Sequence, residues 1–198
     1  MPWWFRSRGG MFYLTAATAQ VFLCVTVPEL KLFFPTLTTS AALREVPFAG
    51  VFPVFSTAVW LYGIDRSRSP GEFLARRARA VAYCDVLLLV TVLVPLSAAF
   101  TVSGEQACLL SLRNTLGIVG MVLGCTVLVG PIGAIIASVG YLIASILFTP
   151  PEGQLLWGWP LAAIDNTAPW YLAGTLCIAG TVLYLIAPRA WRRRLPSR

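Results

Sequence analysis

Apolar runs of membrane-crossing length constrain this chain more than any other feature of its sequence. Ala107–Val129 and Pro131–Thr149 are two such runs, separated by the Gly130-Pro131 break. A helix needs about 20 predominantly apolar residues to cross the hydrocarbon core of a bilayer. Lipid offers backbone amides no hydrogen-bond partner, so spanning segments must be helices or strands of a closed barrel. The runs are continuous rather than alternating, which predicts helices.

The composition agrees with a chain whose solvent is largely lipid. Of its 198 residues, 58% are hydrophobic and only 12% are charged. A soluble domain of this length carries about twice that charged fraction. We therefore predict an all-α, polytopic membrane protein that forms a single domain over residues 1–198, with no separate soluble domain.

Six apolar runs are long enough to be predicted as transmembrane helices. The predicted spans are Met11–Pro28, Phe48–Ile64, Ala80–Val102, Ala107–Val129, Pro131–Thr149 and Trp170–Ala187. The first run could be taken for a signal peptide, but it ends in Pro-Glu-Leu-Lys rather than in a small-residue cleavage site. We interpret it as a retained helix.

The distribution of Lys and Arg predicts the orientation of these spans. With six spans, the N-terminal tail, the loop between the second and third spans and the C-terminal tail share one side. That side holds twelve basic residues, whereas the opposite loops hold only Lys31 and Arg44. Basic residues favour the cytoplasmic side, so both termini are predicted to be cytoplasmic. The net charge of +7 then reflects orientation and contact with anionic lipids, and no nucleic-acid partner is predicted.

The sequence lacks the side chains and motifs of common catalytic sites. It has no histidine, its five cysteines show no CxxC spacing, and neither a P-loop nor GxSxG occurs. We predict no catalytic residue, metal site or cofactor in this chain, and leave open an unfamiliar membrane enzyme. The cysteines are expected to be buried, inert thiols.

A polar segment rich in arginine, Asp65–Ala82, separates the second and third predicted spans. It contains a capping box, in which Ser69 and Glu72 satisfy each other's backbone amides, and Pro70 suits the first helical position. Glu72 and Arg76 are spaced i, i+4, which adds modest support. A short helix is therefore predicted to begin here on the cytoplasmic side.

This short helix has two possible roles. It could be an amphipathic helix that binds lipid, or a rigid element that docks onto a cytosolic partner. The candidate docking residues are Ser69, Glu72, Phe73, Leu74, Arg76 and Arg77.

Two ionisable residues lie within the predicted spans, where such groups are functional candidates by default. Asp85 lies about one turn inside the third span. It either pairs with nearby arginines such as Arg77 and Arg79 or contributes to a polar pathway.

Arg113 lies about two turns into the fourth span, beside Asn114. It either snorkels outward toward Glu105 or Asp165, or lines a polar pathway. Asn114 could form a hydrogen bond to another helix.

Two further patterns bear on packing. Gly120 and Gly124 have GxxxG spacing, which favours close helix approach within the molecule. The outer loop Pro150–Pro169 contains Trp157 and Trp159, and indole rings favour the headgroup level. We expect this loop to be re-entrant or to lie along the membrane surface, with its tryptophans in an aromatic belt.

The six spans, the element at Ser69–Arg79, the Arg113-Asn114-Thr115-Leu116-Gly117 segment and the outer loop Pro150–Pro169 together resemble the membrane subunits of ABC-2-type exporters. In that family a coupling helix between the second and third spans docks onto a separate ATPase. The resemblance implies a permease subunit in a bacterial plasma membrane. It also implies P-loop ATPase partners that bind ATP and Mg²⁺, and a second permease subunit, identical or different. An apolar interior favours a peptide, an antibiotic or a lipid-like substrate, moved by alternating access.

Two other functions remain open from the sequence. The chain could be a non-transporting membrane scaffold, such as an immunity or assembly partner. It could also handle ions or lipids, or act as a membrane enzyme, through Asp85 and Arg113.

Overall fold

The computed structural model describes residues 9–35, 37, 43–67, 83–87, 91–149 and 156–186. This part of the chain is mostly helical. Its helices and strands are α2 (Gly10–Thr26), β1 (Lys31–Pro35), β2 (Leu43–Pro47), α3 (Phe48–Ser67), α5 (Leu93–Ser103), α6 (Gln106–Phe148), the 3₁₀ helix η2 (Leu156–Leu161) and α7 (Ala168–Ile186). Residues 83–87 form a further short helical segment. The predicted docking helix at Ser69–Arg79 lies outside the described residues.

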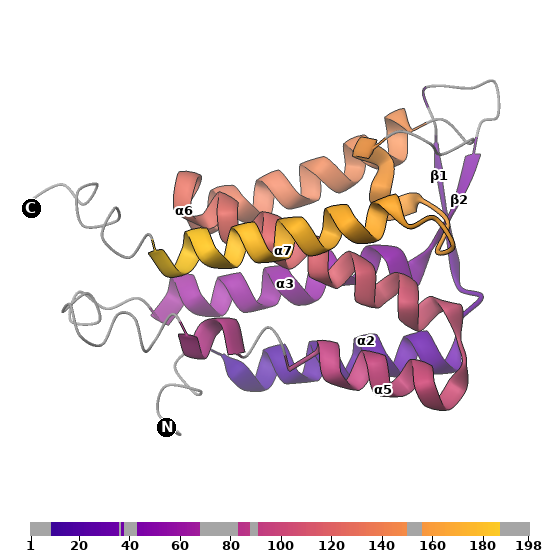
Figure 1. Ribbon diagram of the computed structural model, residues 1–198, viewed down its shortest axis with the longest axis horizontal. Coiled ribbons are helices and arrows are strands. Elements are labelled where there is room, and N and C mark those ends of the chain that lie inside the picture. Colours follow the sequence, from indigo (N-terminus) through magenta and orange to yellow (C-terminus); the bar gives the residue numbers. More distant parts are fainter. Residues whose placement is uncertain are drawn as a thin grey trace, which may run out of the picture.

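The helices lie side by side and alternate in direction (Figure 1). The strands β1 and β2 mark one end of the molecule, which we call the hairpin end. The helix α2 runs toward this end and α3 runs away from it; α5 returns to it, and α7 again runs away. Each predicted span that falls within the described residues therefore corresponds to a helical segment, and the described parts of the third span are residues 83–87 and α5.

The long helix α6 is two helices joined by a sharp turn at Gly130. Gly130 has φ 84° and ψ 171°, a conformation that only glycine adopts without strain. Pro131 follows at the start of the second half, where its missing N–H is not needed. The amide of Leu37 beside the strands donates to the carbonyl of Leu147, so the end of α6 returns to the hairpin end. The break predicted at Gly130–Pro131 is confirmed.

The strands β1 and β2 form an antiparallel hairpin that the all-α prediction lacked. Their register pairs Lys31 with Pro47 and Phe33 with Glu45, and Lys31 forms a 2.8 Å ion pair with Glu45. Arg44 Nη1 donates to the carbonyl of Thr149 at 2.7 Å, which ties the hairpin to the end of α6. Partial burial lowers the pKa of Arg44.

The described helices expose apolar side chains and bury polar ones. Met11, Phe12 and Tyr171 are more than 60% exposed, whereas Gln20 and Arg113 are fully buried. Large apolar exposure of this kind marks an interaction surface in a water-soluble protein, but it is the ordinary state of a helix that faces lipid. Two helices, α6 and α7, are long and apolar enough to cross a membrane.

Candidate functional site

Arg113 and Asn114 occupy the best-defined polar position in the described structure, on α6 about two turns from its start. The Arg113 side chain is fully buried. Its Nη1 donates to the carbonyl of Ala163 at 3.0 Å and its Nη2 donates to the carbonyl of Ala162 at 2.8 Å. Its Nε contacts Asn114 Oδ1 at 3.4 Å. One planar guanidinium thus holds two consecutive carbonyls of a loop about fifty residues away in the sequence.

That loop begins where η2 ends, and its backbone carbonyls stabilise the buried guanidinium of Arg113. The last carbonyls of a helix have no partner within the helix and carry partial negative charge. Arg113 satisfies two carbonyls just past η2. The Asn114 amide donates to the carbonyl of Pro160 at 2.8 Å and to that of Gly50 at 2.9 Å. Together the two side chains join α6, α3 and η2, and we call this arrangement the polar brace.

The polar brace differs from the sequence prediction for Arg113. Among the described residues, neither Glu105 nor Asp165 forms an ion pair with it. The guanidinium instead makes charge-assisted hydrogen bonds to backbone oxygens, which are short and strong. Arg113 therefore positions the loop after η2 and does not snorkel toward a carboxylate.

Trp159, a residue of η2, also holds this element against α6. The indole is only 2% exposed and packs against α6 at Gly117. A Cβ at Gly117 would overlap the Trp159 ring, so glycine is required at this contact. The prediction of an aromatic belt at the headgroup level is wrong for Trp159, because its ring fills a notch in the protein.

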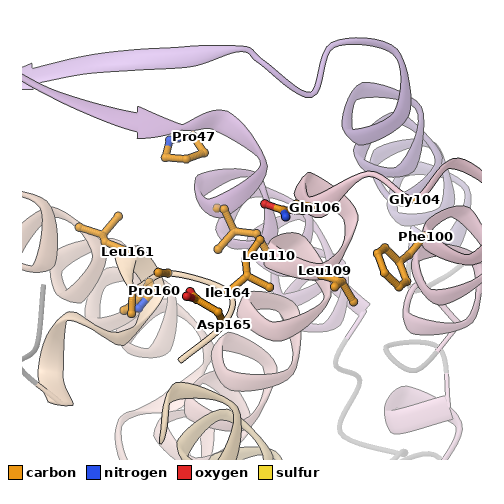
Figure 2. A pocket seen from close by; sticks show the side chains of 13 residues that line it. Pro47, Phe100, Gly104, Gln106, Leu109, Leu110, Pro160, Leu161, Ile164 and Asp165 are labelled. Carbon is orange, nitrogen blue, oxygen red and sulfur yellow. The ribbon is translucent and has the colours of Figure 1, made fainter. Parts of the chain in front are cut away.

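A cavity of about 670 Å³ lies beside the polar brace at the hairpin end (Figure 2). It lies between the start of α3, the end of α5, the start of α6 and the loop after η2. Most of its lining is apolar, and within the part of the chain that the structure describes Asp165 is its one ionisable side chain. The lining residues are Pro47, Gly50, Phe100, Gly104, Gln106, Leu109, Leu110, Pro160, Leu161, Ala162, Ala163, Ile164 and Asp165.

A second polar cluster was not predicted from the sequence. The buried Gln20 amide donates to Ser111 Oγ at 2.8 Å and to Thr115 Oγ1 at 2.9 Å, and its oxygen accepts from Ser56 Oγ at 2.8 Å. These bonds connect α2, α3 and α6. The available signal was a lone glutamine inside the apolar run Met11–Pro28.

Asp85 lies far from this site. Its Oδ2 accepts a 3.2 Å hydrogen bond from Tyr184 Oη near the end of α7. Trp170, near the start of α7, bonds instead to the carbonyl of Ile164 in the loop after η2. Fourteen residues of helix separate Trp170 from Tyr184, or about 21 Å. The structure thus brings Arg113 and Asn114 together but does not bring Asp85 to them, and Arg77 and Arg79 lie outside the described residues.

The chemistry available at the polar brace is positioning and binding. Within the described part of the chain, no three Cys, Asp or Glu side chains gather in a way that could hold a metal ion. All five cysteines are free thiols. No family model, curated protein or solved structure matches this chain.

Proposed function

We propose that the chain is a multi-pass protein of a bacterial plasma membrane, with six crossing segments and both termini in the cytoplasm. The alternating direction of the helices supports this topology. It puts the hairpin end outside, where only Lys31 and Arg44 carry positive charge in the loops, and the opposite end at the Arg-rich segment 65–82. The apolar outer surface of α2 and α7 supports contact with lipid.

Within that topology we propose the role of a permease subunit in an ATP-driven ABC exporter. The observation that carries the proposal is the 3₁₀ helix η2, which lies between α6 and α7 in the chain and is held against α6 by Arg113, Asn114 and Trp159. A re-entrant element at this place in the chain is what the resemblance to ABC-2 exporters implies. The sequence element Ser69–Arg79 falls between α3 and the next helical segment, where the coupling helix of that family lies.

The proposed mechanism needs partners that this chain does not contain. Separate P-loop ATPases would bind ATP and Mg²⁺ and pull on the coupling helix as they close. A second permease subunit, identical or different, would form the other half of the pathway. The substrate would be hydrophobic or amphipathic, such as a peptide, an antibiotic or a lipid-like molecule.

Co-purification tests this proposal directly. The full chain is expressed with a tag in its native host and isolated in a mild detergent. A P-loop ATPase should co-purify with it, and the paired substitution of Phe73 and Leu74 by Asp should abolish that association. The control is Phe33→Asp, an equally polar change of an exposed residue at the opposite end. The exporter role fails if no ATPase is recovered, or if both variants retain it equally.

A non-transporting scaffold is the second candidate, and one observation favours it. The buried groups of the polar brace and of the Gln20 cluster bond to the protein itself. In the described part of the chain they hold helices together and open no polar route. Recovery of a stable membrane partner without any ATPase would support this role.

A further inference from the structure

We propose that the cavity beside the polar brace binds an amphipathic cation, a molecule with a compact apolar body and one positively charged group. Binding sites for small molecules are concave, mostly apolar and carry a few polar groups that fix orientation. The volume of about 670 Å³ falls within the range typical of such sites. Figure 2 shows Phe100, Leu109 and Leu110 among the apolar side chains that line the cavity.

The charged groups in the lining indicate which charge a ligand should carry. Of the described residues that line the cavity, only Asp165 is ionisable, and Gln106 adds a neutral amide. Both offer oxygen acceptors. The ring of Phe100 attracts a cation through its negative face.

The polar brace adds no cationic side chain to the described lining of the cavity. Arg113 lies behind the wall of the cavity, is fully buried and does not line it. Its guanidinium donates to the carbonyls of Ala162 and Ala163, so these N–H groups are not available to a ligand in the cavity.

This inference deepens the proposed function by naming a substrate class, and it rests on that function only for the cavity's position at the outer end. A molecule leaving toward the outside would meet the cavity there. Binding itself requires no ATPase and can be measured on the isolated chain.

Ethidium and phenanthridine form a matched pair of probes, because they share a ring system and only ethidium carries a fixed positive charge. The full chain is purified in a neutral detergent, and ethidium binding is followed by fluorescence anisotropy. Asp165→Asn should weaken ethidium binding about tenfold, as expected for loss of a bond to a charged group. Glu105→Gln is the matched control, because Glu105 is a neighbouring carboxylate that does not line the cavity; it should leave the affinity unchanged.

A second variant tests the location. Leu109→Trp fills the cavity and should abolish ethidium binding, while the melting temperature reports that the chain remains folded. Asp165 is exposed, so Asp165→Asn is expected to fold normally.

Equal ethidium affinity in Asp165→Asn and in the unsubstituted chain would overturn the proposal. Equal affinity for phenanthridine would also overturn it and identify a purely apolar site, such as one for an acyl chain. These binding results do not depend on whether an ATPase co-purifies with the chain, so the two proposals can fail separately.

Discussion

Arg113 carries its charge in a fully buried position, and two backbone carbonyls stabilise it there. Hydrogen bonds to charged groups contribute about 1.5–3 kcal/mol each. Arg113→Met removes both bonds and leaves the carbonyls of Ala162 and Ala163 without this donor. We expect a loss of about 3–6 kcal/mol in stability, measured as a lower melting temperature in detergent.

Arg44 is the natural control for this substitution. It is also an arginine that donates to a backbone carbonyl at the hairpin end, but it makes a single such bond, to Thr149, and is only partly buried. Arg44→Met should therefore cost less than half as much. Arg113→Lys should fall between the two, because an ammonium lacks the planar fork that spans both carbonyls. Equal losses for Arg113→Met and Arg44→Met would contradict the role of the polar brace.

Sequence reasoning finds the residues of the site more readily than their partners. Arg113 and Asn114 stand out because they interrupt an apolar run. Their acceptors are backbone carbonyls 46 to 64 residues away, and a carbonyl has no sequence signature. Gln20 was missed for a related reason, since Ser56, Ser111 and Thr115 are unremarkable until folding brings them together.

The contact between α6 and α7 depends on Gly120 rather than on the whole GxxxG spacing. A Cβ at Gly120 would overlap the backbone of Leu176 and Cys177, whereas a Cβ at Gly124 would meet only Gly180 Cα, at 3.9 Å. Gly120→Ala should therefore force the helices apart at a cost of about 1–3 kcal/mol. Gly124→Ala should be neutral or stabilising by up to about 1 kcal/mol, because alanine favours helix.

Thermal unfolding of the two glycine variants in the same detergent distinguishes these outcomes. Each adds one methyl group to the same helix, so lipid and detergent contacts are closely matched. Similar melting temperatures for both would mean that α6 and α7 do not approach as the structure has them.

The packing of η2 depends on a complementary pair, the large Trp159 and the small Gly117. Gly117→Ala alone should destabilise the chain, because the added methyl group overlaps the indole. Trp159→Leu alone should cost about 2–4 kcal/mol through the cavity that it leaves. The double variant should lose less than the sum of the two single losses, since the methyl group occupies part of that cavity. A double-mutant cycle on melting temperatures measures this coupling, and strict additivity would contradict the contact.

At the level of elements, hydrophobic runs predicted the helices well, and Gly130-Pro131 predicted the turn within α6. Both signals lie within the segment that they predict. The β1–β2 hairpin and the burial of Trp159 have no such local signal, because they depend on pairing and packing with distant segments. No feature of the sequence marks Trp159 for burial, which depends on the space that Gly117 leaves beside the indole.

At the scale of the molecule, the described part of the chain has the polarity expected of a protein immersed in lipid, with many apolar side chains outside and most buried polar groups hydrogen-bonded. Both termini of such a chain lie on the same side of the membrane only when the number of crossings is even. The alternation of helices in Figure 1 and the Arg-rich tails both favour that arrangement. The number of crossings is thus open to a direct chemical test.

Single cysteines introduced into a background without the five native cysteines make that test. Phe33, at the hairpin end, is 63% exposed, and Ser7 and Ser197 belong to the two tails. Phe33→Cys should react with a membrane-impermeant maleimide on intact cells. Ser7→Cys and Ser197→Cys should react only after the cells are opened, because basic tails remain cytoplasmic. Labelling of one tail but not the other on intact cells would require an odd number of crossings and would contradict the proposed six-span topology.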